Sequence, residues 1–232
     1  MFLDLLFPRE CVGCHQEGSY LCKDCKKSLY AHPEMCPFCH KKSTDFQTCS
    51  PCKAEGQSLE GIIIGFSYQT LMKKLILKVK FGHKKDIISF LAERLALLIQ
   101  TNGKLVCLLE QKQLFLSFVP SHRRRKYLEK GYNQSELLAK ELANQLGLPI
   151  LPLAKKQKYT VSQLKLNKAQ RTKNLKEAFT VRHLETLPLG ATVIFVDDVT
   201  TTGSTLSELA KVMKKERPDV HIWGAVLARH MG

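Results

Sequence analysis

The chain has 232 residues, of which 44% are hydrophobic and 25% are charged, and this composition excludes a disordered protein. It contains no run of about 18 apolar residues that would span a membrane. The net charge is +15, and its excess is central: residues 59–119 carry nine basic and four acidic side chains, and residues 120–185 carry fifteen and five. Such a field attracts polyanions and pyrophosphate, although a solvated lysine-rich surface is the alternative.

The first eight residues are apolar, but they lack the basic start and the small-residue cleavage site of a signal peptide. We interpret them as a packing segment and expect a cytoplasmic protein with no membrane insertion. The length allows one core-forming domain of ordinary size and a small appendage.

Eight of the nine cysteines form four C-x-x-C pairs before residue 53. The pairs are Cys11 and Cys14, Cys22 and Cys25, Cys36 and Cys39, and Cys49 and Cys52. Two thiolates with this spacing chelate one face of a tetrahedral ion, so the four pairs have the capacity for up to two zinc ions. A disulfide cluster is the alternative, but it needs an oxidising compartment that nothing else in the chain supports.

Each C-x-x-C pair is a zinc knuckle, and the sequence leaves open which two knuckles share an ion. Sequential sites and a cross-braced arrangement are both compatible with the spacing. His15, His32 and His40 lie beside or between the pairs and are weaker ligand candidates. Four protein ligands leave no position for water or substrate, so we expect structural zinc. We assign residues 1–58 to this small Cys-rich domain and residues 59–232 to a second domain.

The second domain opens with a predicted strand at residues 59–68. A short amphipathic helix is predicted over residues 71–79 and a longer helix over residues 86–100. Cys107 lies in the apolar run 105–109 and is predicted to be an ordinary core residue.

A second predicted strand, residues 114–119, ends in a basic loop over residues 120–134, ahead of another amphipathic helix. Five cations lie among residues 123–130, and Gly131 permits close approach of the backbone. The loop therefore has the charge to neutralise a pyrophosphate, and a generic basic loop is the alternative.

The stretch 155–179 is long, polar and cationic. Segments of this length inside compact α/β domains are usually functional lids or disordered. It can be interpreted as a lid, or as a track for single-stranded nucleic acid with phosphates on cations and bases stacked on an aromatic ring. The residues chosen for that track are Lys156, Lys158, Tyr159, Lys165 and Arg171.

The apolar run 193–196 predicts a buried strand of a parallel sheet, whose ligands bind at the carboxyl ends of strands. Asp197 and Asp198 follow, where carboxylates accept hydrogen bonds from ribose hydroxyls. A helix predicted to begin near Leu206 would turn its positive end toward a phosphate. A plain strand-to-helix turn is the alternative. The small residues between the acids and the helix are Thr201, Thr202, Gly203, Ser204 and Thr205.

The string from Val193 to Thr205 resembles the phosphoribosyl pyrophosphate (PRPP) motif of type I phosphoribosyltransferases. The resemblance implies that Asp197 and Asp198 hold the ribose hydroxyls and that Thr201 to Thr205 wrap the 5′-phosphate. It also implies an α/β fold, with a parallel sheet that carries helices on both faces. The basic loop is similar to the pyrophosphate loop of those proteins, which implies roles for Arg123, Lys130 and Gly131.

Over nearly its full length the chain resembles the ComF family, the double-zinc-ribbon, phosphoribosyltransferase-like proteins of bacterial competence. The resemblance implies a cytoplasmic factor that handles incoming single-stranded DNA during natural transformation and binds PRPP with Mg2+, with other competence proteins as partners. Lys130, Lys156 and Lys158 replace arginines that are frequent in the family, and lysine loses the bidentate fork. The segments that carry the resemblance are the cysteine-rich head, Lys80-Phe-Gly, Pro120, Lys130-Gly-Tyr-Asn-Gln134, Thr160, Gln163, Arg171, Asn174, Phe179 and Val196 to Thr205.

Catalysis is a separate question from PRPP binding. Purine-salvage relatives carry a carboxylate three residues after the second motif acid, where this chain has Thr201. Threonine cannot act as a general base at neutral pH. Two hypotheses follow: a nucleic-acid-handling module with PRPP as its ligand, or an active pentosyltransferase that moves ribose 5-phosphate to an unidentified acceptor in an Mg2+-assisted reaction.

Overall fold

A four-stranded parallel sheet forms the centre of the protein in a computed structural model that describes residues 9–82, 85–121, 133–157 and 178–230. The strand order is β1-β6-β5-β2. The continuous apolar runs in these strands suit a sheet that is covered on both faces. The strands are β1 (Gly61–Ser67), β2 (Leu114–Phe118), β5 (Thr192–Thr200) and β6 (His221–Arg229).

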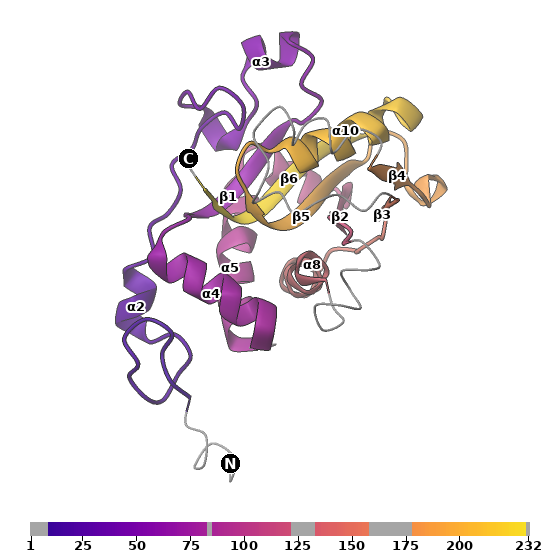
Figure 1. Cartoon of the computed structure of the whole chain (residues 1–232). Helices are drawn as coiled ribbons and strands as arrows, with labels where there is room; N and C mark the ends of the chain where they lie inside the picture. The colour runs from indigo at the N-terminus through magenta and orange to yellow at the C-terminus, as the bar shows by residue number, and fades with distance from the viewer. Residues whose placement is uncertain (1–8, 83–84, 122–132, 158–177, 231–232) are drawn as a thin grey trace.

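Helices cover both faces of this sheet, as the resemblance implied, and Figure 1 shows α10 on one side with α4, α5 and α8 on the other. Ile194 and Val196 of β5 belong to the core under the three helices, whereas Val193 and Phe195 belong to the core under α10. This alternation follows from the two-residue period of a strand. The helices are α4 (Thr70–Gly82), α5 (Lys85–Thr101), α8 (Gln134–Leu146) and α10 (Ser204–Glu216).

Shorter elements complete the described part of the chain. In that part, no helix is long and apolar enough to cross a membrane. A small antiparallel pair joins β3 (Ala154–Lys156) and β4 (Phe179–Val181), at the two ends of the predicted lid or track. The remaining elements are α2 (Lys23–Lys27), η1 (Thr44–Phe46), α3 (Ser50–Ala54), α6 (Leu105–Glu110) and η3 (Leu184–Thr186).

The strand predicted over residues 193–196 is longer than expected. It continues to Thr200 because β6 pairs with it as far as Arg229. The acidic pair therefore lies within the last part of a strand and not in a loop beyond it.

The prediction for Cys107 is wrong, because this side chain is exposed. The apolar run forms the short helix α6, which buries Leu105. A residue two positions later is turned by about 200° around the helix axis, which points Cys107 away from the core.

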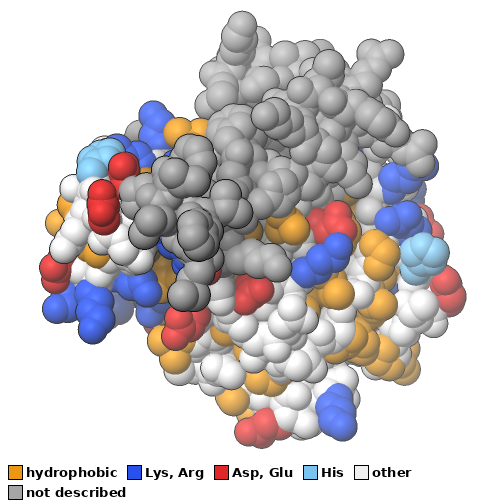
Figure 2. Space-filling view, turned by 90° about the horizontal axis from the view of Figure 1, so that it is seen from below, with side chains coloured by type: hydrophobic (Ala, Val, Ile, Leu, Met, Phe, Trp, Pro, Cys, Tyr) orange, Lys and Arg blue, Asp and Glu red, His pale blue; other side chains and the backbone are white. Residues whose placement is uncertain are grey.

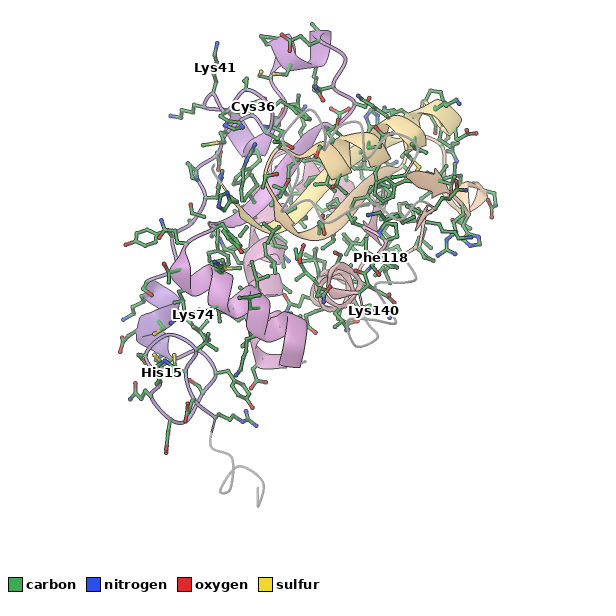
Figure 3. All side chains as sticks on the ribbon, viewed as in Figure 1. His15, Cys36, Lys41, Lys74, Phe118 and Lys140 are labelled. Atoms are coloured by element: carbon green, nitrogen blue, oxygen red, sulfur yellow. The ribbon has the colours of Figure 1, made fainter. Side chains whose placement is uncertain are left out.

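The two halves of the cysteine-rich segment pack against opposite sides of the molecule. Cys11 and Leu21 join the core that contains α4 and α5, and Arg9 pairs with Asp86 of α5 at 2.9 Å. Phe46 joins the core that contains α10. Figure 3 shows this separation, with His15 beside the first half and Cys36 in the second half.

Candidate zinc centres and sugar-phosphate site

The cysteines gather into two clusters of four in chain order, Cys11 to Cys25 and Cys36 to Cys52. Within each cluster the four sulfur atoms lie within 4.8 Å of one another, and this excludes the cross-braced arrangement. The Sγ atoms of Cys14 and Cys22 are 3.7 Å apart, and those of Cys39 and Cys49 are 3.5 Å apart. Tetrahedral zinc with Zn–S bonds of about 2.3 Å requires separations near 3.8 Å, so both clusters fit structural zinc.

Hydrogen bonds from backbone N–H groups stabilise the thiolate form of one cysteine in each cluster. Burial opposes ionisation of Cys11, but the N–H groups of Cys22, Cys14 and Gly13 outweigh it and lower its pKa to about 6. Cys36 has the same balance and a pKa of about 6. The hydrogen bond that the thiol of Cys25 donates to Cys11, together with burial, raises the pKa of Cys25 to about 12. Zinc binding must therefore release protons as it ionises the remaining thiols.

The histidines near the knuckles make their contacts elsewhere. Nδ1 of His15 lies 3.9 Å from Glu10, and Nδ1 of His32 is 2.8 Å from the carbonyl oxygen of Pro33. Nε2 of His40 lies 2.7 Å from the guanidinium of Arg229. In the described part of the chain the metal sites are thus built from cysteine alone.

The acidic pair lies at a step in the edge of the sheet. β2 stops at Phe118, opposite Val196, so Asp197 and Asp198 extend past it while still following β6. The N-terminus of α8 fills this step. Its N-cap Asn133 donates to the carbonyl oxygen of Val119 at 2.9 Å, and Ser135 donates its hydroxyl to Oδ1 of Asp197 at 2.8 Å.

The two carboxylates have different surroundings. Burial, and then the charge of Asp198, raise the pKa of Asp197 to about 8, although the hydrogen bonds from Ser135 and the N–H of Asp198 oppose the shift. Asp198 and Gln134 contribute to the wall of a small apolar cavity between α4, α5 and α8. Burial and the charge of Asp198 also raise the pKa of Tyr68. A carboxyl group with a strongly raised pKa at a sheet edge, such as that of Asp197, is characteristic of functional sites.

The loop after β5 turns at Gly203, which has a φ of 73°. A side chain there would be strained, and its Cβ would lie 3.0 Å from Ile62. Gly203 is the N-cap of α10 and supplies no side-chain acceptor to the first N–H groups of that helix. Those N–H groups and the positive end of the helix dipole suit an anion. Thr200 fixes the turn, because its Oγ1 accepts the N–H of Gly203 at 3.0 Å.

The structure brings together Asp197, Asp198 and the segment 201–205, at the carboxyl end of β5 and the start of α10. Lys156 lies in β3, with Nζ 5.6 Å from the centre of the Phe179 ring. The other predicted residues fall outside the described ranges: Arg123, Lys130, Gly131, Lys158, Tyr159, Lys165 and Arg171.

Two residues at this edge escaped the sequence analysis. Ser135 donates a hydrogen bond to Asp197. The sequence feature that could have identified Ser135 is its place two residues after an asparagine that caps a helix. Arg229 donates through Nε to the carbonyl oxygen of Thr201 at 3.1 Å. The sequence feature that could have identified Arg229 is its place at the end of a mostly apolar strand, where a buried charge requires partners.

Two family models match the chain. A double zinc ribbon domain covers residues 2–53, and a phosphoribosyl transferase domain covers residues 133–231. Together with the cysteine clusters and the parallel sheet, these matches define the class: a zinc-ribbon head followed by a phosphoribosyltransferase domain.

Relatives extend the similarity to almost the whole chain. Competence protein F of Haemophilus influenzae is 30% identical over 229 residues, which are 96% of this chain and 98% of that protein. The chain belongs to the ComF family of competence proteins.

More distant relatives cover slightly less of the chain. DNA utilization protein YhgH of Escherichia coli K12 is 29% identical and covers 88% of both chains, and competence protein ComFC of Bacillus subtilis is 23% identical over 84% of this chain and 76% of its own. The crystal structure of adenine phosphoribosyltransferase from Leishmania tarentolae aligns with a TM-score of 0.32 at 16% identity, over 63% of this chain and 73% of that one.

Metal analysis of the purified protein should give about two zinc ions per chain. Cys14→Ser and Cys39→Ser should each leave about one, because each removes a ligand from only one of two separate clusters. Cys107→Ser is the control and should keep both ions, since this thiol belongs to neither cluster. Loss of both ions from either single-cluster variant would contradict two independent sites.

Replacing Asp197 with asparagine should stabilise the protein, and increasingly so as the pH rises. The folded pKa of about 8 lies above the ordinary value of 3.8, so wild type loses stability as pH rises between these values, while the variant cannot ionise. Between pH 6 and pH 8 the gain in unfolding free energy should grow by about 2 kcal/mol, as measured by urea denaturation of zinc-loaded protein. An equal difference at both pH values would contradict the raised pKa.

Proposed function

We propose that this protein handles incoming single-stranded DNA during natural transformation and binds PRPP, with Mg2+, at the acidic pair and the loop before α10. The observation that carries the PRPP site is the adjacency of Asp197 and Asp198 to a helix N-terminus capped by Gly203. The names of the relatives, competence protein F and DNA utilization protein YhgH, support a role in DNA uptake or use.

In the proposed complex, the carboxylates accept hydrogen bonds from the ribose hydroxyls, and the N–H groups at the start of α10 meet the 5′-phosphate. Carboxylate oxygens are also among the ligands that Mg2+ takes together with phosphate oxygens. Burial, and then the charge of Asp198, raise the pKa of Asp197, so a cation or a hydroxyl donor beside the two carboxyl groups would be favourable. Mg2+ would neutralise the pyrophosphate charge.

The proposed contact with DNA is electrostatic. Residues 120–185 carry the largest charge excess in the chain, with fifteen basic and five acidic side chains. In the described part of that segment, Lys155, Lys156 and Arg182 lie on or next to the β3–β4 pair. On the face shown in Figure 2, lysine and arginine side chains gather mainly at the left and right edges. We assign the head to residues 1–58 and the PRPP and DNA contacts to residues 59–232.

Substitution at the acidic pair tests the PRPP site. Asp198→Asn should weaken PRPP binding about tenfold to a hundredfold in calorimetry with Mg2+, because hydrogen bonds to a charged group contribute about 1.5–3 kcal/mol. The exposed Asp86→Asn is the matched control and should bind as wild type does. Unchanged affinity in Asp198→Asn would refute the site. Pyrophosphate release from PRPP in the same sample would favour the transferase alternative.

Salt dependence tests the contact with DNA. The affinity for a single-stranded oligonucleotide should fall with salt at a slope of about −0.7 in log–log units per neutralised phosphate. Lys156→Glu should reduce both affinity and slope, whereas Lys41→Glu, on the exposed surface of the charge-balanced head, should change neither (Figure 3). A slope near zero for wild type would contradict electrostatic binding of the strand.

A further inference from the structure

The Cys36–Cys39 pair of the second cysteine cluster, called the second zinc knuckle below, lies against residues 201–203, called the sugar-phosphate loop. The two segments are far apart in sequence. A Cβ atom on Gly203 would lie 4.0 Å from the ring of Phe38, which stands between the ligands Cys36 and Cys39. One turn into α10, Ser207 donates its hydroxyl to Oε1 of Gln57 at 3.2 Å, just beyond the same cysteine cluster. The head therefore forms the wall behind the loop.

Arg229 connects the two sides of this contact. Its side chain, at the end of β6, is only 1% exposed. Its Nε donates to the carbonyl oxygen of Thr201 in the loop at 3.1 Å. Its Nη2 donates to the carbonyl oxygen of Pro37 in the knuckle at 2.7 Å and lies 2.7 Å from Nε2 of His40. The planar guanidinium of Arg229 thus hydrogen-bonds to both the loop and the knuckle and holds them at a fixed separation.

A buried guanidinium requires negative charge nearby. Pro37 lies between the ligands Cys36 and Cys39, and His40 directly follows Cys39, so both contacts of Nη2 depend on the folded arrangement of this cluster. A zinc ion with four thiolates carries a net charge of about −2, so a loaded cluster supplies this counter-charge. The tie between loop and knuckle thus needs a folded, loaded second site.

Among the residues that the structure describes, the first cysteine cluster makes no comparable contacts with the sugar-phosphate loop. A Cβ on Gly13 would contact Leu71 of α4, Arg9 pairs with Asp86, and Lys26 lies over the ring of Phe90 in α5. These contacts all lie on the side of α4 and α5.

We infer that Arg229 is a positioning residue that ties the sugar-phosphate loop to the second zinc knuckle, so that loading of the second cysteine cluster, and not the first, sets the affinity of the loop for a phosphorylated sugar. This inference rests on the proposed PRPP site for its ligand. The mechanical tie itself is independent of which ligand the loop takes.

The first test compares two matched cysteine variants. Cys14→Ser and Cys39→Ser each remove the exposed second cysteine of the first knuckle in one cluster. Cys39→Ser should weaken PRPP binding by about tenfold or more in calorimetry with Mg2+, the loss expected when a charge-assisted contact no longer orders the loop. Cys14→Ser should stay within about twofold of wild type. Equal effects of the two variants, large or small, would overturn the inference.

The second test separates the tie from general stability. Arg229→Lys keeps the charge, but a single ammonium nitrogen cannot replace the fork that spans Thr201 and Pro37. Amide hydrogen exchange in residues 201–203 should accelerate by about tenfold or more in this variant, with zinc content at the wild-type value. Arg217→Lys is the matched control, because Arg217 also donates to backbone carbonyls, those of Leu184, Leu187 and Pro188, at the other end of α10. Its unfolding midpoint should fall while exchange in the loop stays unchanged. Wild-type exchange in Arg229→Lys would overturn the inference.

These readouts distinguish failure of the tie from failure of the proposed function. If wild type does not bind PRPP, the proposed function falls, while the exchange measurement still decides whether Arg229 orders the loop. Should Arg229→Lys lose zinc, exchange in residues 201–203 is compared between Cys39→Ser and Cys14→Ser, which each disrupt one cluster while Arg229 stays in place. Faster exchange in Cys39→Ser than in Cys14→Ser would support the tie, and equal rates would overturn it.

Discussion

The parallel pairing of β5 with β2 and β6 is the constraint on which the candidate site depends. β1, β6 and β5 end in one row, with Ser67 beside Arg229 and Arg229 beside Thr200. β2 ends at Phe118, opposite Val196, and leaves a step in that row. Because parallel strands present all their carboxyl ends at one edge, this step receives the acidic pair and the N-terminus of α8, and α10 begins at the same edge of the sheet. A sheet with strands of equal length would have no room there for the contact between Ser135 and Asp197.

Filling that step with carboxyl groups costs stability. Asp197 receives a hydroxyl from Ser135 and an N–H from Asp198, yet burial and the neighbouring charge still raise its pKa. An asparagine could accept the same hydroxyl without ionising. An acid at this position is therefore explained better by the proposed ligand, whose hydroxyl groups need an acceptor, than by folding.

Local patterns allowed the cysteine clusters, the β5 strand and the acidic pair to be predicted, because each is encoded within a few consecutive residues. The sequential pairing of knuckles was left open, and spatial proximity decided it. Ser135 and Asp197 are 62 residues apart, and Arg229 and Pro37 are 192 residues apart. Neither contact could be predicted from a local sequence pattern. Cys107 shows the converse limit: an apolar run does not reveal which of its residues a short helix turns outward.

The long reach of Arg229 has a consequence for how the chain folds. The last described strand ends by contacting residues near the start of the chain, so the loop reaches its final position only when the second knuckle is formed. Contacts of such sequence separation form late, because loop closure must precede them. The zinc ribbon, in contrast, closes over short spacings and gains its free energy from metal. The metal site is therefore the preformed surface on which the end of β6 and the loop before α10 are ordered, which makes the head a structural part of the site and not an appendage to it.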